Sequence, residues 1–147
     1  IVDELERKVS PRAALAQKDS RTFAMRDEGD LRVARAAARD ACLAFSASPF
    51  DAQRIATAVS ELGRNIVAYT PGGQIDLEVH RGPPLRVRIV ASDSGSGIAQ
   101  LETVLAGQYR SRTGLGRGLS GVKKLMDQFR VQTGTQGTRI EAEVTFL

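Results

Sequence analysis

Two polar residues four positions apart, Glu61 and Asn65, are the first pair in this sequence whose chemistry could act together. In a helix, that spacing places both side chains on one face. A carboxylate accepts a proton from an attacking hydroxyl or water, and a side-chain carbonyl oxygen is a suitable ligand for magnesium. Taken alone, the pair is more typical of the polar flank of an amphipathic surface helix.

A glycine-rich segment, Asp93-Ser94-Gly95-Ser96-Gly97, follows a predicted strand. An ionised aspartate only accepts hydrogen bonds, which suits the amino group of adenine. Gly95 and Gly97 carry no side chain that would block a base lying beside Asp93. Taken alone, the segment is equally suited to a tight turn after a strand.

A third motif places Gly114, Gly116 and Gly118 before a predicted helix. Free backbone N–H groups and the positive end of the helix dipole would then face phosphate groups. The pattern G-x-x-x-x-G-K-[ST] is absent, and so is the setting of a dinucleotide-binding fingerprint. We expect a flexible lid here, mobile from about residue 99 to 115 without nucleotide, and a mobile loop without a ligand is the alternative interpretation. The order and spacing of the three motifs together predict a site for ATP.

The elements that position these motifs follow from hydrophobic periodicity. Ser48 as N-cap and Pro49 predict the start of a long helix that should run to about Tyr69. Gly63 lies inside this helix at a cost of roughly 1 kcal/mol relative to alanine, which close packing against a neighbour or the nucleotide would explain. Periodicity elsewhere predicts the remaining elements, with strands near 22–25, 75–79, 85–89, 129–133 and 138–146 and helices near 31–45 and 119–126.

Length and composition indicate a single globular domain. Of 147 residues, 41% are hydrophobic and 26% are charged, and no apolar run approaches the length of a membrane span. The net charge is +4, but the 21 basic residues are scattered among 17 acidic residues, so nucleic acid is not expected as a partner. A membrane is not expected as a partner either. The single cysteine, Cys42, suits a reducing cytoplasm. Residues 1–20 are expected to be an appended segment or linker, and residues 21–147 the domain.

In combination, the motifs resemble those of the GHKL ATP-binding superfamily over about residues 22–147. Within it, the segments 55–69 (IATAVSELGRNIVAY) and 114–129 (GLGRGLSGVKKLMDQF) are most similar to the stressosome switch serine/threonine kinases and anti-sigma factor kinases. The resemblance implies a Bergerat-type α/β fold, a two-layer sandwich with a mixed, mostly antiparallel sheet and helices on one face.

The resemblance also implies roles for individual residues. Glu61 is expected to be the catalytic base, Asn65 the ligand of Mg²⁺ in MgATP, and Asp93 the contact to adenine. Further residues are expected to line the base and the phosphates or to support the adenine pocket: Gly95, Gly97, Gly114, Gly116, Gly118 and Thr138.

The function that follows is that of a serine/threonine protein kinase. Its expected substrate is a small regulatory protein, a STAS-domain antagonist, in a partner-switching stress or sigma-factor pathway that includes a phosphatase or a sigma factor. An ATP-dependent binding module of the anti-sigma type without catalysis is the alternative, although mere binding would not need Glu61. An ATPase subdomain of a larger protein is less expected, because no transducer domain follows Leu147. His80 lies away from every motif, which argues against a complete histidine kinase. The sequence does not specify an oligomeric state.

Overall fold

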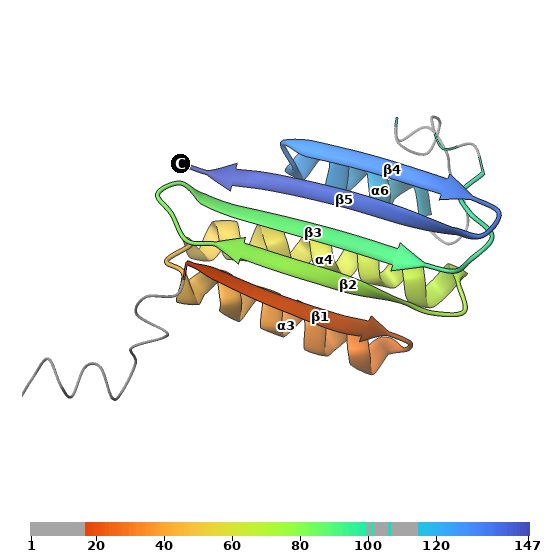
Figure 1. Cartoon of the computed structure of the whole chain (residues 1–147), viewed down its shortest axis with the longest axis horizontal. Coiled ribbons are helices and arrows are strands. Elements are labelled where there is room, and N and C mark those ends of the chain that lie inside the picture. Colours follow the sequence, from red (N-terminus) through yellow and green to blue (C-terminus); the bar gives the residue numbers. More distant parts are fainter. Residues whose placement is uncertain (1–16, 100, 102–105, 107–114) are drawn as a thin grey trace, which may run out of the picture.

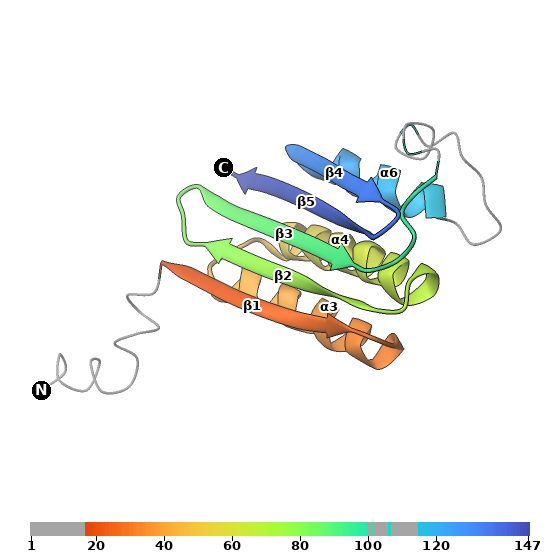
Figure 2. The ribbon, with the colours of Figure 1, turned by 45° about the vertical axis from the view of Figure 1, so that its right-hand side comes forward.

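The computed structural model describes residues 17–99, 101, 106 and 115–147, and the side chains of residues 115–117 are not described. Five strands and three helices are assigned in this part of the chain. In order, they are β1 (Lys18–Met25), α3 (Glu28–Ala44), α4 (Pro49–Tyr69), β2 (Gly73–His80), β3 (Leu85–Asp93), α6 (Leu115–Leu125), β4 (Gln128–Gly134) and β5 (Gly137–Phe146). The strands form one sheet in the order β1-β2-β3-β5-β4, with β1 and β4 at its edges (Figures 1 and 2).

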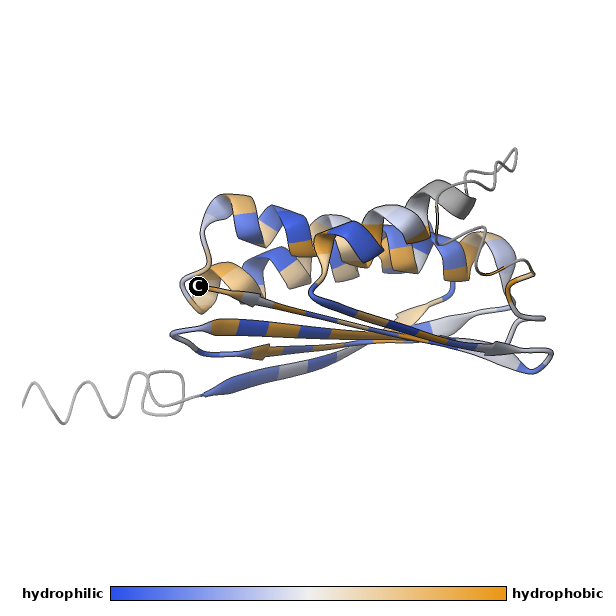
Figure 3. Cartoon of the chain, turned by 90° about the horizontal axis from the view of Figure 1, so that it is seen from above, coloured by the Kyte–Doolittle hydropathy of each residue, from blue (hydrophilic) through white to orange (hydrophobic). Residues whose placement is uncertain are grey.

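The α/β sandwich expected from the sequence is confirmed. Figure 3 shows the helices on one face of the sheet only. Alternation places apolar side chains of the strands toward the helices, and these side chains form one core with the buried stripes of α3, α4 and α6. All four pairings of the described strands are antiparallel, so the mixed component expected for the sheet is corrected to a purely antiparallel one.

The start of α4 is the one predicted. The Oγ atom of Ser48 accepts a hydrogen bond of 3.0 Å from the backbone N–H of Asp51, and Pro49 occupies the first turn. The helix ends at Tyr69, where Thr70 serves as the C-cap. The cap fixes where the helix begins, and its buried apolar stripe fixes which side faces the sheet and therefore where Glu61 and Asn65 lie.

Gly63 is explained by packing within the protein. A Cβ atom built there would lie 2.6 Å from Cδ1 of Leu31 and 3.1 Å from the sulfur of Met25. The residue therefore allows α4 to approach both α3 and β1 closely. Of the two explanations that the sequence left open, a neighbouring element is the one the structure provides.

Two boundaries differ from those expected. Residues 18–20, assigned by sequence to an appended segment, belong to β1 and pair with β2. Helix α6 begins at Leu115 rather than near residue 119, so Gly116 and Gly118 lie in its first turn and not in the loop before it. Residues 1–16 of the expected segment lie outside the described residues.

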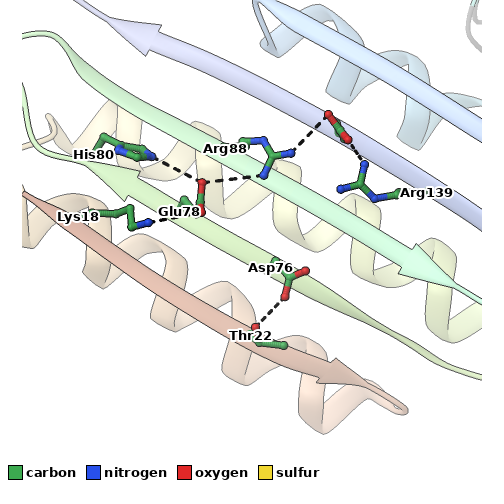
Figure 4. A network of polar contacts seen from close by, with 8 residues as sticks. Lys18, Thr22, Asp76, Glu78, His80, Arg88 and Arg139 are labelled. Carbon is green, nitrogen blue, oxygen red and sulfur yellow. Dashed lines mark hydrogen bonds and ion pairs between the residues drawn. The ribbon is translucent and has the colours of Figure 1, made fainter.

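The outer face of the sheet is polar and carries a chain of ion pairs (Figure 4). Glu78 lies within 4 Å of Lys18, His80 and Arg88, and Arg88 reaches across to Glu141, which also pairs with Arg139. His80 therefore lies on the face opposite the helices.

Candidate functional site

Glu61 and Asn65 lie one turn apart on α4, as their spacing predicts. The Glu61 carboxylate accepts a hydrogen bond of 3.0 Å from Nη1 of Arg64 through Oε1, and its side chain is 32% exposed. Asn65 is turned further into the molecule. Glu61 is thus accessible from solvent while Asn65 reaches a pocket behind it.

Helix α6 closes against this part of α4 at Gly118. A Cβ atom built on Gly118 would lie 2.8 Å from Oε2 of Glu61 and 3.8 Å from Oδ1 of Asn65. Any larger residue would displace the carboxylate, so glycine is what permits the close approach. The first turn of α6, with backbone N–H groups that have no partner within the helix, therefore lies beside both polar residues of α4.

Asp93 ends strand β3 at the same side of the molecule. Its Oδ1 atom accepts a hydrogen bond of 2.9 Å from the backbone N–H of Gly95, which leaves Oδ2 available to another donor. In the sheet register, Asp93 stands between Gly73 of β2 and Thr138 of β5. Gly95 packs on Thr70, where a Cβ atom would come within 2.9 Å of the Thr70 side chain. The aspartate loop is thereby held against the end of α4.

Gly97 has a positive φ of 92°, and a Cβ atom there would overlap the carbonyl oxygen of Gly134. The next residue, Ile98, donates its N–H to Oγ1 of Thr133 at 2.8 Å, and Thr133 shares a further hydrogen bond of 2.8 Å with Thr138. Two threonines of the β4–β5 hairpin thus anchor the loop that follows Asp93.

These elements surround a pocket whose empty volume is about 490 Å³, including space that is open to solvent. Its polar lining comprises Asn65, Tyr69, Thr70, Asp93, Ser96 and Thr138. Its apolar lining comprises Leu62, Ile66, Ala91, Ile98, Leu119 and Ile140. An apolar slot with a few fixed acceptors is what a purine base requires.

The predicted site residues divide into four groups. Asn65, Asp93, Gly97 and Thr138 line the pocket, while Glu61, Gly95 and Gly118 lie beside it through the contacts given above. Gly116 lies in the first turn of α6. Gly114 and almost all of the expected lid at residues 99–115 lie outside the described residues.

Sequence reasoning missed several residues of the pocket. Tyr69 could have been found, because it follows Leu62, Asn65 and Ile66 on one face of α4. Thr70, which lines the pocket, and Thr133, which supports the loop beside it, carry no such signal, because their positions depend on how a helix end and a hairpin meet the loop after β3.

The side-chain amide of Asn65 lacks a hydrogen-bond partner for its nitrogen. Its Nδ2 atom is buried and has no hydrogen-bond partner. A buried polar group without a partner costs about 1–3 kcal/mol, so an amide aimed into a pocket fits a site whose ligand completes its contacts. The donor set also fits MgATP, since Asn65 offers an oxygen to a hard cation and Asp93 an acceptor to an amino group.

Two other reactive residues lie outside the pocket lining. Cys42 is fully buried in the core, and burial raises the pKa of its thiol to about 12, so it is not a nucleophile at neutral pH. His80 contacts Glu78 on the outer sheet face (Figure 4). In the described part of the chain, none of the helices combines the length and apolarity needed to cross a bilayer.

Comparisons with known proteins identify the family and the fold. The family model described as a histidine kinase-like ATPase domain matches residues 23–144. Serine/threonine-protein kinase RsbT of Bacillus subtilis (strain 168) is 39% identical over 118 residues, which cover 78% of this chain and 88% of that protein. A chain of the crystal structure of the SiaB-SiaC complex from Pseudomonas aeruginosa aligns over 97% of both chains with a TM-score of 0.54 and 12% identity, which is a likeness of fold alone.

Proposed function

The chain belongs to the histidine kinase-like ATPase domain family, and from that premise we propose that it is a serine/threonine protein kinase that transfers a phosphoryl group from MgATP to a small regulatory protein. The 39% identity to a protein named as a serine/threonine kinase supports the reaction type. The observation that carries the proposal is the placement of Glu61 and Asn65 beside the first turn of α6, with Asp93 in the same pocket as Asn65.

Asp93 and Thr138 hold the adenine end of the site. Oδ2 of Asp93 is the acceptor for the adenine amino group, because Oδ1 is already engaged by Gly95. Thr138 keeps the neighbouring loop in place through its hydrogen bond to Thr133. The apolar lining excludes water from the faces of the base.

Asn65 and the first turn of α6 hold the phosphate end. When bound, MgATP supplies the transferable phosphoryl group together with a cation that neutralises phosphate charge. Asn65 provides an oxygen ligand to that cation. Gly116 and Gly118 let backbone N–H groups at the start of α6 approach the phosphates.

Glu61 acts on the acceptor. Its half-buried carboxylate, which solvent can reach, takes the proton of the acceptor hydroxyl as the hydroxyl oxygen bonds to the transferred phosphorus, and ADP leaves. This assignment distinguishes a kinase from an ATP-dependent binding module of the anti-sigma type, which has no use for a base.

We propose a STAS-domain antagonist as the substrate, in a partner-switching pathway that ends in a sigma factor or a phosphatase. The name of the relative given above supports a serine/threonine kinase, and the STAS substrate rests on the motif resemblance described in the sequence analysis. We also propose that the segment preceding β1 is an appendage to the kinase domain and that the protein acts in the cytoplasm.

The test is incubation of the protein with labelled ATP, Mg²⁺ and a panel of STAS-domain proteins, followed by mass-spectrometric mapping of any phosphorylated residue. We expect label on a serine or threonine of one acceptor, and its absence with Glu61→Ala. ATP-dependent binding of a STAS protein without transfer by the wild type would support the binding-module alternative and overturn the kinase proposal.

A further inference from the structure

Two large apolar side chains are exposed on the helix layer. Val33 of α3 is 63% exposed and Phe50 of α4 is 74% exposed, and among the described large hydrophobic residues only the terminal Leu147 is also classed as exposed. One such residue needs no explanation. Both, however, lie on the sides of their helices that face away from the buried stripes, and therefore on the outer surface of the helix layer.

Glu61 lies on the same surface. Phe50, Thr57 and Arg64 recur at intervals of seven residues, are all exposed, and mark the outer side of α4, with Glu61 one turn after Thr57. The distance from Phe50 to Glu61 along the axis is about 16 Å at 1.5 Å per residue.

Val33 of α3 lies at the level of Glu61 along the helix layer. The short connection at 45–48 makes α3 and α4 antiparallel, and Leu31 packs directly on Gly63. Two residues further along α3, Val33 therefore lies level with the turn of α4 that contains Glu61. The exposed valine and the proposed base thus occupy the same level of the helix layer on adjacent helices.

Besides Arg64, which pairs with Glu61, small residues lie next to the carboxylate. Thr57, one turn before Glu61, carries a small side chain, and Gly118 of α6 lies against the Glu61 carboxylate. A Cβ atom on Gly121, one turn further along α6, would have nothing within 4 Å. A protein surface can therefore approach the helix backbones closely at this point, and a hydroxyl on a short loop can reach the carboxylate.

The charges of the helix layer are predominantly positive. Among the described side chains of the three helices, the exposed cations are Arg32, Arg35, Arg39, Arg64, Lys123 and Lys124, the exposed acids are Glu28 and Asp40, and Asp30, Asp51, Arg54 and Glu61 are half-buried. A partner that docks on this layer is expected to carry carboxylates around its contact surface.

We propose that the phospho-acceptor protein docks on the outer face of α3 and α4 around Glu61, with Val33 and Phe50 as its apolar anchors and acidic residues at its rim. The proposal rests on the kinase function, because an acceptor hydroxyl that reaches Glu61 must come from the solvent side of this face. A standard interface covers about 800 Å² per partner, a patch of roughly 16 Å radius, so one docked domain spans both anchors and the base.

The test uses Val33→Glu and Phe50→Glu, singly and together, in the full chain. The matched control is Gln132→Glu, which introduces the same residue at an exposed position of β4. Binding to a panel of STAS-domain proteins is measured by interferometry. Phosphoryl transfer is measured in single-turnover experiments with labelled ATP, and ATP affinity is measured by calorimetry. Circular dichroism checks that each variant is folded.

The double variant should weaken acceptor binding, and raise the half-saturating acceptor concentration, by about tenfold or more, with ATP affinity unchanged. Gln132→Glu should behave like the wild type, and binding by the wild type should weaken as salt increases. If the double variant binds and phosphorylates the acceptor like the wild type, or if Gln132→Glu impairs both to the same extent, the proposed docking surface is wrong. Neither result would contradict the kinase function. Val33- and Phe50-dependent binding without any transfer would support the surface and overturn the kinase function. A wild-type protein that binds no acceptor of the panel would count against both.

Discussion

Asp93 and Thr138 stand directly opposite each other on β3 and β5, and both line the same pocket. Thr138 is linked to Thr133, which in turn receives the N–H of Ile98 from the loop that Asp93 begins. The carboxylate proposed for adenine recognition is therefore held by the sheet on one side and by a hydrogen-bonded loop on the other. This rigidity is what a specific acceptor requires.

Replacement of Asp93 by alanine should weaken ATP binding roughly tenfold or more, because the adenine amino group loses its buried acceptor at a cost of about 1–3 kcal/mol. The control is Asp76→Ala on β2, whose carboxylate accepts from Thr22 on the outer sheet face (Figure 4). Calorimetry should show near-normal affinity for the control. Wild-type affinity in a folded Asp93→Ala protein would remove Asp93 from the adenine site.

Glu61→Ala and Asn65→Ala should separate catalysis from binding. Glu61→Ala should retain ATP affinity and lose up to about 10²- to 10⁴-fold in transfer, with a smaller loss if the transition state is loose. Asn65→Ala should also weaken the magnesium-dependent part of ATP binding. ATP affinity with and without Mg²⁺ is compared with single-turnover transfer. A wild-type transfer rate in Glu61→Ala would show that Glu61 is not the base.

Gly118→Ala should slow transfer more than it weakens ATP binding. The added methyl group would lie 2.8 Å from Oε2 of Glu61 and would push the carboxylate from its position. Single-turnover kinetics at saturating ATP, beside calorimetry, measures the two effects. If ATP affinity falls while the transfer rate at saturating ATP does not, Gly118 is needed for phosphate binding only and does not position the Glu61 carboxylate.

Gly63→Ala should destabilise the fold despite the better helix propensity of alanine. Overpacking against Leu31 and Met25 costs about 1–3 kcal/mol, which exceeds the gain of about 1 kcal/mol from propensity. Gly121→Ala is the control, since open space surrounds that position in α6, and it should stabilise the protein. Urea denaturation of both variants gives the comparison. Equal stabilisation by the two alanines would mean that Leu31 and Met25 move aside for the added methyl group at no cost in stability.

The buried thiol of Cys42 should make part of the stability dependent on pH. Its pKa is raised from 9.0 to about 12 in the folded protein by burial and by the nearby charges of Asp19 and Asp51. The unfolded chain loses this proton first, so the contribution is complete below pH 9 and declines as the pH rises toward 12. The free energy of unfolding of the wild type should therefore fall more steeply above pH 9 than that of Cys42→Ala. Parallel slopes for the two proteins would contradict the prediction.

Local chemistry explains why much of the fold was predictable. Ser48 and Pro49 determine where α4 begins, and a helical repeat then obliges Glu61 and Asn65 to share a face wherever the helix packs. Alternating side chains likewise determined which face of β2, β3 and β5 is buried. Interactions of this kind span a few residues and can be read from spacing.

The start of α6 that was predicted from helix propensity is wrong. Three glycines within a few residues indicated a loop up to residue 118, yet Gly116 and Gly118 are helical. Gly118 contacts Glu61 and Asn65, and α6 packs along α4, so tertiary contacts offset a helix cost of about 1 kcal/mol per glycine.

The sequence by itself determined the polar residues of the site and the elements that carry them, because each depends on neighbours within a turn or a strand. Only the tertiary structure decided that β5 lies between β3 and β4, which brings Thr138 beside Asp93 and Thr133 against Ile98. Likewise, the contact of Thr70 with Gly95 and of Gly118 with Glu61 depends on how helices pack against the sheet and against each other. Such contacts join residues far apart in the chain, and their energies come from burial and shape complementarity that no local spacing encodes.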